Sequence, residues 1–246
     1  DKELPSQFNE QYRPDLIHRA VLALQSSARQ VYGPQPGAGK RRNARLSKRR
    51  RDYKTSYGIG IGRVARKIHG GKGVRFNWVG ASTPQTVGGR RAHPPKTEKI
   101  WEEKINIKER RKAIRSAMAA TLNPQLVKER GHHIPSEYPF IVDASFESLA
   151  KTKNIEKTLL QLGFEQEMER SSQTKIRPGK GKFRGRKYIQ KKGLLIVVSD
   201  ICPAQKAAEN IPGIDIVPVK ALNAHLLAPG AMPGRVTLWT TKALEV

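Results

Sequence analysis

The chain has little of three things that many proteins depend on. Among its 246 residues there is one cysteine, Cys202, so an intramolecular disulfide or a cysteine-based zinc cluster is excluded. No apolar run reaches the roughly 18 residues that a membrane span needs, and no secretory signal is visible. We therefore expect no membrane-spanning segment and a reducing, cytoplasmic setting. Acidic side chains are also scarce, with 21 Asp and Glu against 47 Lys and Arg.

This imbalance gives a formal charge of +26 and a pI of about 10.5. Such values are outside the range of an ordinary cytosolic enzyme. They predict binding to a polyanion, which at this point could be RNA, DNA or an anionic membrane surface.

The charge is concentrated in two segments. Residues 37–99 contain 18 Lys and Arg but only two acids, and residues 172–192 contain nine Lys and Arg and no acid. The remaining 162 residues carry 20 basic and 19 acidic groups. The sequence therefore predicts a nearly neutral body with two cationic segments.

The body is expected to be α/β, with a parallel sheet flanked by helices. Short apolar runs that fit buried strands alternate with segments of helical period, the pattern of a sheet covered on both faces. Expected helices span 14–32, 106–123, 146–162 and 203–211, and expected strands span 138–143, 193–200, 214–219 and 235–240. Asn106 and Glu109 have the spacing of a capping box, and Ile107 is among the residues expected to face the core.

Residues 37–99 show no helical or strand period. Within them, the stretch 60–80 has five Lys and Arg, one His, six glycines and no carboxylate. Self-repulsion and the lack of apolar burial predict disorder for the isolated segment. Once the charge is neutralised, local structure such as a short helix within 43–54 becomes possible.

Two glycine-rich stretches resemble cofactor motifs but lack their context. "GIGIG" at 58–62 has no flanking strand and helix, and in "GPQPGAGKR" at 33–41 Arg41 stands where a phosphate-binding loop needs Ser or Thr. We interpret these glycines as positions where the backbone approaches a crowded partner. No cofactor is expected.

An enzyme remains an alternative, because Asp143, Ser199 and Asp200 follow expected strands, where α/β enzymes place their chemistry. The alternative is an RNA-modifying enzyme such as a methyltransferase with an α/β catalytic domain. No nucleophile elbow or paired carboxylates accompany these residues, and capping or turn roles explain them more simply. We therefore predict that the chain is not an enzyme.

Aromatic residues are interspersed with the basic ones: Tyr53, Tyr57, Phe76, Trp78, Phe183 and Tyr188. Lys and Arg neutralise phosphates, glycine allows close backbone approach, and aromatic rings stack on unpaired bases. The combination favours irregular folded RNA. A chromatin-like protein that binds plain DNA duplex is a second competing interpretation.

Several motifs together resemble the universal large-subunit ribosomal protein L four family, archaeal type. They are "LPSQF" with "RPDLIHRAV" (4–21), "YGIGIGRVAR" (57–66), "GGRRAHPPKTEK" (88–99), "ERRKAIRSAMAAT" (109–121), "TKIRPGKGKFRGRKY" (174–188) and "LAPGAMPGRVTLWT" (227–240). The resemblance covers nearly the whole chain. It also implies an opening strand before Pro14, so an N-terminal piece is expected to be missing.

The resemblance implies a structural protein of the large ribosomal subunit, located in the cytoplasmic ribosome. A globular α/β body (1–36 and 100–246) would carry an extended RNA-penetrating loop (37–99) that reaches the peptide exit tunnel, and a second basic loop (172–192). Its expected partners are large-subunit ribosomal RNA, other large-subunit ribosomal proteins and the nascent peptide passing the tunnel, and no membrane partner is expected. A role in subunit assembly follows as a hypothesis.

The basic runs and the resemblance together point to three groups of contact residues. RNA contacts of the long loop would be Arg41, Arg42, Arg45, Lys48, Arg49, Arg50, Arg51, Arg63, Arg66, Lys67, Arg90, Arg91, His93 and Lys96. The tunnel tip would comprise Lys72, Arg75, Phe76, Asn77 and Trp78. The second loop would add Lys175, Arg177, Lys180, Lys182, Arg184, Arg186 and Lys187.

Overall fold

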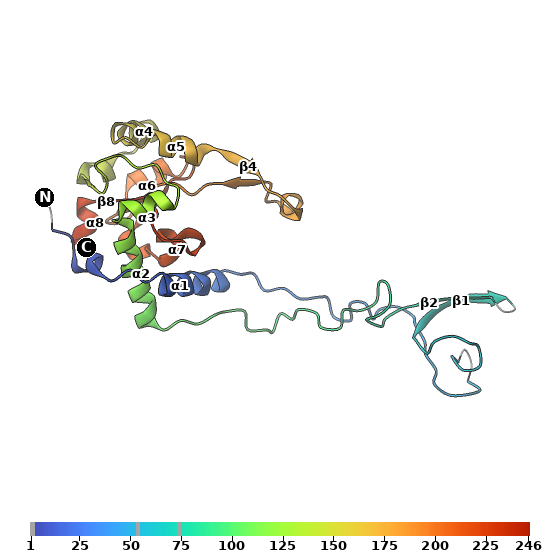
Figure 1. Ribbon diagram of the computed structural model, residues 1–246. Helices are drawn as coiled ribbons and strands as arrows, with labels where there is room; N and C mark the ends of the chain where they lie inside the picture. Colours follow the sequence, from blue (N-terminus) through green and yellow to red (C-terminus); the bar gives the residue numbers. More distant parts are fainter. Residues whose placement is uncertain (1–2, 53–54, 73–74) are drawn as a thin grey trace. The chain divides into compact units, whose positions relative to one another are not determined.

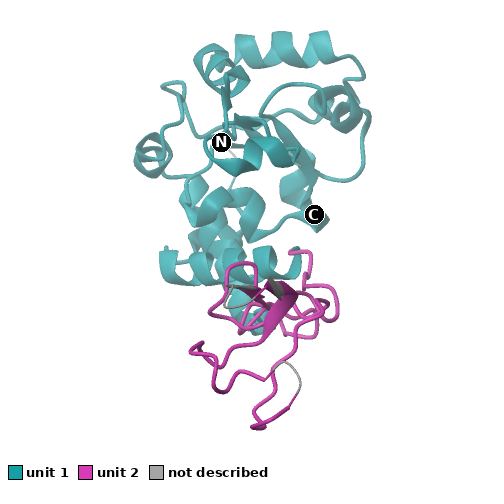
Figure 2. Cartoon of the chain, turned by 90° about the vertical axis from the view of Figure 1, so that its right-hand side faces the viewer, with its two compact units in different colours: residues 1–28, 102–246 teal, residues 29–101 magenta. Residues whose placement is uncertain are grey.

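The computed structural model describes residues 3–52, 55–72 and 75–246, without the side chains of Arg75 and Phe76. The chain divides into two compact units (Figure 2). Unit 1 comprises residues 1–28 and 102–246, and unit 2 comprises residues 29–101.

Unit 1 is built on a four-stranded sheet with strand order β3-β8-β6-β7. The strands are β3 (Ile141–Val142), β6 (Leu195–Val198), β7 (Asp215–Pro218) and β8 (Thr237–Thr240), and all their pairings are parallel (Figure 1). The parallel sheet confirms the α/β prediction. The strands are shorter than their apolar runs, and only two residues of the run 138–143 enter the sheet.

Helices cover both faces of the sheet. The helices of this unit are α1 (Pro14–Ser27), α2 (Ile107–Thr121), α3 (Pro124–Glu129), α4 (Thr152–Gln161), α5 (Glu165–Ser172), α6 (Pro203–Ala208), α7 (Ala224–Leu227) and α8 (Thr241–Glu245). Short 3-10 turns lie at η1 (Ser6–Asn9), η2 (Ala144–Ser148), η3 (Lys180–Arg184), η4 (Val219–Ala221) and η5 (Pro229–Ala231).

The two faces form two separate cores. In β6, Ile196 and Val198 pack with α4 and α6, whereas Leu195 and Val197 pack with α1, α2 and α7. Successive side chains of a strand point to opposite faces, so a strand covered on both sides is apolar at every position. This explains why the run "LLIVV" shows no alternation.

All four predicted helices have different bounds, and the one expected at 203–211 ends at Ala208. The helix expected at 14–32 ends at Ser27, where the Ala28 N–H closes the last turn onto the Leu24 carbonyl. Val31 and Tyr32 are exposed, so their apolar surface does not extend the buried face of α1. The helix expected at 146–162 is divided, because Leu149 and Lys151 have extended backbone between η2 and α4. Sequence analysis did not predict α5.

The start of α2 also differs from prediction. Asn106 is the N-cap residue, but its side chain makes no capping hydrogen bond, and Glu109 instead accepts a hydrogen bond from Arg19 on α1. Ile107 is 68 % exposed, so it does not belong to the core. Asn106 and Glu109 have the spacing of a capping box, but the Glu109 carboxylate binds Arg19 of the neighbouring helix instead.

Unit 2 contains more regular structure than its composition suggested. Strands β1 (Arg66–Lys72) and β2 (Arg75–Gly80) form an antiparallel hairpin with an irregularity between Ile68 and Gly71. The expectation that 60–80 follows no strand period was therefore wrong for this hairpin. The described residues of 43–54 form no helix, and Arg45 instead makes an isolated bridge to Arg66.

A buried carboxylate joins α5 to the segment after α3. Glu167 is 1 % exposed and accepts hydrogen bonds from Arg170 (2.6 and 2.8 Å) and from the His133 N–H (3.0 Å). His132 Nδ1 lies 2.7 Å from Glu167 Oε1, and the His133 N–H donates to Oε2. Burial raises the pKa of Glu167, but these bonds outweigh burial and lower the pKa to about 2.

Glu167→Gln should lower the free energy of unfolding at neutral pH by about 2–3 kcal/mol. The charge-assisted hydrogen bonds are lost, and the Arg170 guanidinium is left without its carboxylate partner. The folded-state pKa lies below the usual 4.5, so the carboxylate stabilises the fold above that pH and this contribution is lost as pH falls towards 2. The difference between wild type and variant should shrink over that range. Urea unfolding followed by circular dichroism measures it.

Glu169→Gln is the matched control, because Glu169 is exposed on the same helix. Its unfolding free energy should stay within about 0.5 kcal/mol of wild type. A Glu167→Gln protein as stable as wild type at neutral pH would contradict the assignment.

Candidate nucleic-acid interface

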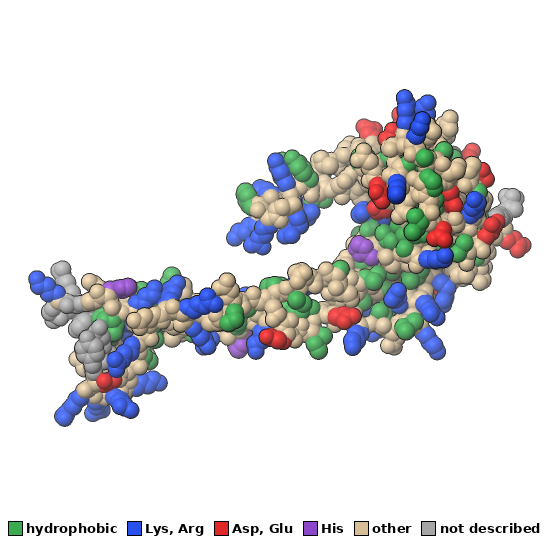
Figure 3. Space-filling model, turned by 180° about the vertical axis from the view of Figure 1, so that it is seen from behind, with side chains coloured by type: hydrophobic (Ala, Val, Ile, Leu, Met, Phe, Trp, Pro, Cys, Tyr) green, Lys and Arg blue, Asp and Glu red, His purple; other side chains and the backbone are tan. Residues whose placement is uncertain are grey.

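Lysine and arginine side chains are distributed very unevenly over the surface. They crowd the part of the chain around the β1–β2 hairpin and the loop after β4, whereas red acidic side chains gather on the rest of unit 1 (Figure 3). Opposite charges neutralise one another on that part of unit 1. The two cationic segments have few internal counter-ions and remain available to an external polyanion.

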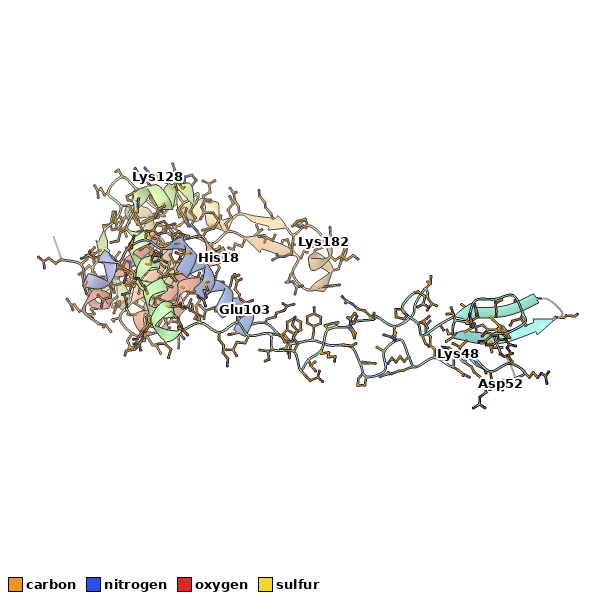
Figure 4. All side chains as sticks on the ribbon, turned by 60° about the horizontal axis from the view of Figure 1, so that its bottom comes forward. His18, Lys48, Asp52, Glu103, Lys128 and Lys182 are labelled. Atoms are coloured by element: carbon orange, nitrogen blue, oxygen red, sulfur yellow. The ribbon has the colours of Figure 1, made fainter. Side chains whose placement is uncertain are left out.

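The predicted contacts between Arg41 and Arg51 are all exposed. Arg41 donates to the Pro36 carbonyl at 2.7 and 3.0 Å and so closes its own turn, while Arg45 lies 3.3 Å from Asp52. Lys48, Arg49 and Arg50 make no side-chain hydrogen bond or ion pair within the described residues. Lys48 and Asp52 lie on the segment beside the hairpin (Figure 4).

The Arg45–Arg66 bridge brings several predicted contacts into one groove. A cavity of about 570 Å³ is lined by Arg42, Asn43, Arg45, Arg66, Lys67, Ile68 and His69, with no carboxylate in the lining. Arg66 is oriented by bonds to the Gly62 and Val64 carbonyls. Like charges held this close favour an anion between them, and a phosphate group fits this requirement.

Arg63 lies outside this groove. Its guanidinium carbon is 5.4 Å from the centre of the Tyr57 ring, and it donates to the Tyr57 hydroxyl at 3.1 Å. The pair presents a charged group next to an aromatic ring.

The two arms of unit 2 pack against each other between residues 33–40 and 89–98. Gly39 has φ +74°, and a Cβ there would lie 2.5 Å from the Arg90 Cα. The close approach predicted for this glycine-rich stretch is thus to the chain's own return arm. Gly58 has φ +77° but nothing within 4 Å of a Cβ. Of the return-arm contacts, Arg91, His93 and Lys96 are exposed and Arg90 is half-buried.

The predicted tip lies on the hairpin. Lys72 pairs with Arg75 along the backbone, Asn77 is exposed and Trp78 is half-buried. The Arg75 and Phe76 side chains and Tyr53 lie outside the described part of the chain.

The second basic loop is a hairpin of β4 (Thr174–Ile176) and β5 (Tyr188–Gln190), with Lys182 on the 3-10 turn η3 at its end (Figure 4). Arg177 donates to the Arg186 and Tyr188 carbonyls and therefore braces the hairpin. The other predicted contacts are exposed: Lys175, Lys180, Lys182, Arg184, Arg186 and Lys187. Phe183 is 83 % exposed beside Lys182, and Tyr188 lies beside Lys187.

The polar groups after the strands are engaged in the fold. Asp143 accepts from the Ser145 hydroxyl (2.6 Å) and N–H, which lower its pKa, and Asp200 accepts from the Ile201 N–H and from Lys220. The Ser199 hydroxyl donates to Glu147 at 2.7 Å. These contacts agree with capping and turn roles.

Sequence analysis missed Glu147 itself. It is buried and also accepts from the Ser199 N–H (2.9 Å) and the Thr240 hydroxyl (2.6 Å), so it ties η2 to the ends of β6 and β8. The only sequence feature that could have indicated a buried role for Glu147 was its place inside an amphipathic segment. Among the described residues, no group of three or more His, Cys, Asp or Glu is arranged to hold a metal. The described helices include none with the length and apolarity to cross a membrane.

Comparison with known proteins gives consistent matches along the whole chain. The sequence model of the ribosomal protein L4/L1 family matches residues 2–246. The large ribosomal subunit protein uL4 of Nanoarchaeum equitans is 56 % identical over 99 % of this chain and 91 % of its own length. The uL4 proteins of Archaeoglobus fulgidus and Methanocaldococcus jannaschii are each 47 % identical over the same shares.

Gly39→Ala should separate the two arms of unit 2, since the added methyl would meet the Arg90 backbone. We expect amide hydrogen exchange of residues 86–98 to rise several-fold. Gly58→Ala is the matched control: it has the same positive φ without the steric contact, so it should leave exchange in 86–98 unchanged. Equal exchange in both variants would show that the arms do not depend on this contact.

Proposed function

The chain belongs to the ribosomal protein L4/L1 family, and from this premise we propose that it binds large-subunit ribosomal RNA through its two cationic segments. As a member of this family it is a structural protein of the large subunit of the cytoplasmic ribosome, and it acts in translation. It shares that subunit with ribosomal RNA and other ribosomal proteins. The observation that carries the proposal is the separation of 27 Lys and Arg, with only two acids, from a nearly neutral remainder.

The physical basis is neutralisation of phosphates. Each Lys or Arg that contacts a phosphate releases condensed counter-ions, which drives binding and makes it depend steeply on salt. Arg42, Arg45 and Arg66 line the groove and offer several guanidinium donors, although Arg45 also pairs with Asp52 at 3.3 Å. One RNA strand with neighbouring phosphates satisfies this arrangement.

Exposed aromatic rings allow recognition of bases in addition to phosphates. Phe183 and Tyr188 lie beside Lys182 and Lys187, so bases and phosphates can be bound side by side. Unpaired bases are accessible in loops and bulges of folded RNA but are stacked inside plain duplex. This favours structured RNA over the DNA duplex of the competing interpretation.

A long loop that reaches the peptide exit tunnel is the finer part of the proposal. An arm of about 30 residues spans at most about 100 Å when extended, so even half this length reaches far beyond a small domain. The tip at Lys72–Trp78 would then line the tunnel and contact the nascent peptide. Glycines at 58 and 60, which have φ of +77° and +68° and open space around them, would let the inward arm approach RNA closely.

A role in subunit assembly follows from the same electrostatics. A loop that binds separate RNA segments holds them together before other proteins arrive, and the loop gains order as it does so. No observation of the described residues favours the RNA-modifying enzyme, since Asp143, Ser199 and Asp200 are bound within the fold.

Replacing Lys48, Arg49 and Arg50 with Gln should weaken binding to transcribed large-subunit RNA. The slope of log affinity against log salt should fall by about 2 to 3, because up to three phosphate contacts are lost. The matched control replaces Lys151, Lys153 and Lys157, which are exposed on and next to α4, with the same loss of charge. A filter-binding titration over a range of salt compares them, and equal slopes for the two triple variants would contradict the proposal.

Deleting residues 55–95 tests the assembly role. In reconstitution of the large subunit, we expect particles that sediment more slowly or fall apart at lower magnesium, because the pinned RNA segments separate. Binding of the remaining unit to RNA through 172–192 should persist. Native particles of normal stability would count against the assembly role.

A further inference from the structure

A pocket lies where the two chain ends of unit 2 meet. It has a volume of about 540 Å³ and combines an aromatic pair, Tyr32 and Trp101, with the consecutive prolines Pro94 and Pro95. This volume is within the roughly 300–1,000 Å³ typical of small-ligand sites. Neither aromatic residue is among the predicted RNA contacts.

The aromatic pair is held together but incompletely covered. The ring centres of Tyr32 and Trp101 are 5.2 Å apart with an interplanar angle of 32°, and Tyr32 is 51 % exposed. The Arg29 guanidinium carbon lies 4.4 Å from the Trp101 ring centre. The same guanidinium carbon is 5.7 Å from the Tyr32 ring centre, so Arg29 lies against both rings, and the exposed part of Tyr32 and the prolines form the surface for a further flat group.

The pocket also has a strong positive charge. Arg91, Lys96 and Lys99 line it, and no carboxylate does. The Lys99 ammonium is 5.1 Å from the Trp101 ring centre, so charge and aromatic surface adjoin. A proline-rich peptide would use the rings but not the three cations, whereas a nucleotide uses both.

One hydrogen-bond donor in this cluster has no acceptor. The Trp101 Nε1 is buried and lacks a partner within the described part of the chain. Because this nitrogen is enclosed by the chain, a ligand in the pocket can contact the Trp101 ring but not its N–H.

Resting on the RNA-binding function proposed above, we infer that this pocket holds one unpaired nucleotide of single-stranded RNA. The base packs against the Tyr32–Trp101 pair and the prolines, and the adjoining phosphates contact the three cations. The pocket therefore distinguishes strands that carry bases from a bare phosphate backbone, which a run of lysines and arginines without rings, such as residues 40–51, cannot do.

The test compares two short ligands on the full chain at moderate salt. One is a uridine pentamer that carries 4-thiouridine, and the other is an abasic ribose-phosphate oligomer of the same length. Stacking of one base is worth about 1–3 kcal/mol, so the pentamer should bind roughly 5- to 150-fold more tightly. Photocrosslinks should map to Tyr32 or Trp101.

Tyr32→Leu and Trp101→Leu should each reduce this preference several-fold and leave abasic binding unchanged. Tyr12→Leu is the matched control, because Tyr12 is an exposed tyrosine of unit 1, and it should keep the full preference. Circular dichroism checks that both variants fold. If Trp101→Leu does not fold, Tyr32→Leu still tests the pocket.

Equal affinity for the two oligomers, or crosslinks confined to other residues, would overturn the inference. Binding of transcribed large-subunit RNA, measured in parallel, separates this result from a failure of the proposed function. If the large RNA binds and the base preference is absent, only the nucleotide pocket is wrong. If neither the oligomers nor the large RNA binds, the RNA-binding function itself fails.

Discussion

Unneutralised positive charge on unit 2 and on the 174–190 hairpin is the constraint on which the rest of the structure depends. Arginines and lysines that lack carboxylate partners repel one another, so the chain must hold them in place by other means. Local hydrogen-bonded structures hold these side chains in place. They are the β1–β2 hairpin, the Arg45–Arg66 bridge, and the turns that Arg41 and Arg177 close by donating to backbone carbonyls. A guanidinium has five N–H donors, so one that braces a turn still has donors to offer a phosphate.

Charges inside unit 1 follow the opposite rule. Arg235 is fully buried, but it donates to Asp215 at 2.6 Å and to the Gly193, Leu194 and Leu226 carbonyls. Glu167 and Glu147 are likewise bonded to several donors. A buried charge without partners is very costly, whereas a paired and hydrogen-bonded one can be accommodated and fixes the elements around it. The buried ions of unit 1 therefore stabilise its fold, whereas the exposed cations of the two basic segments remain available to an external polyanion.

The same contrast separates the motifs that carried the family resemblance. In "APGAMPGR", Gly234 has φ +86° and its Cβ position would lie 2.8 Å from the Leu126 carbonyl oxygen, while the final Arg235 is buried. This motif is a structural element of unit 1. "GGRRAHPPK" instead supplies the return arm and lines the pocket beside Trp101. Two equally distinctive sequence motifs thus serve folding in one case and an exposed surface in the other.

The sequence by itself determined the segregation of charge and the α/β class, because both depend on local composition: a short, β-branched apolar run such as "LLIVV" between helical segments fits a strand covered on both faces. Most of the basic residues that it singled out as contacts are exposed, since few acidic residues near them in the chain could neutralise them. Only the tertiary structure decided that Arg235 is buried while Arg91 is exposed, that Glu147 joins strand ends, and that Tyr32 meets Trp101. These outcomes depend on contacts between residues far apart in the chain. No local sequence pattern distinguishes Arg235, which pairs with Asp215, from an arginine that has no carboxylate partner.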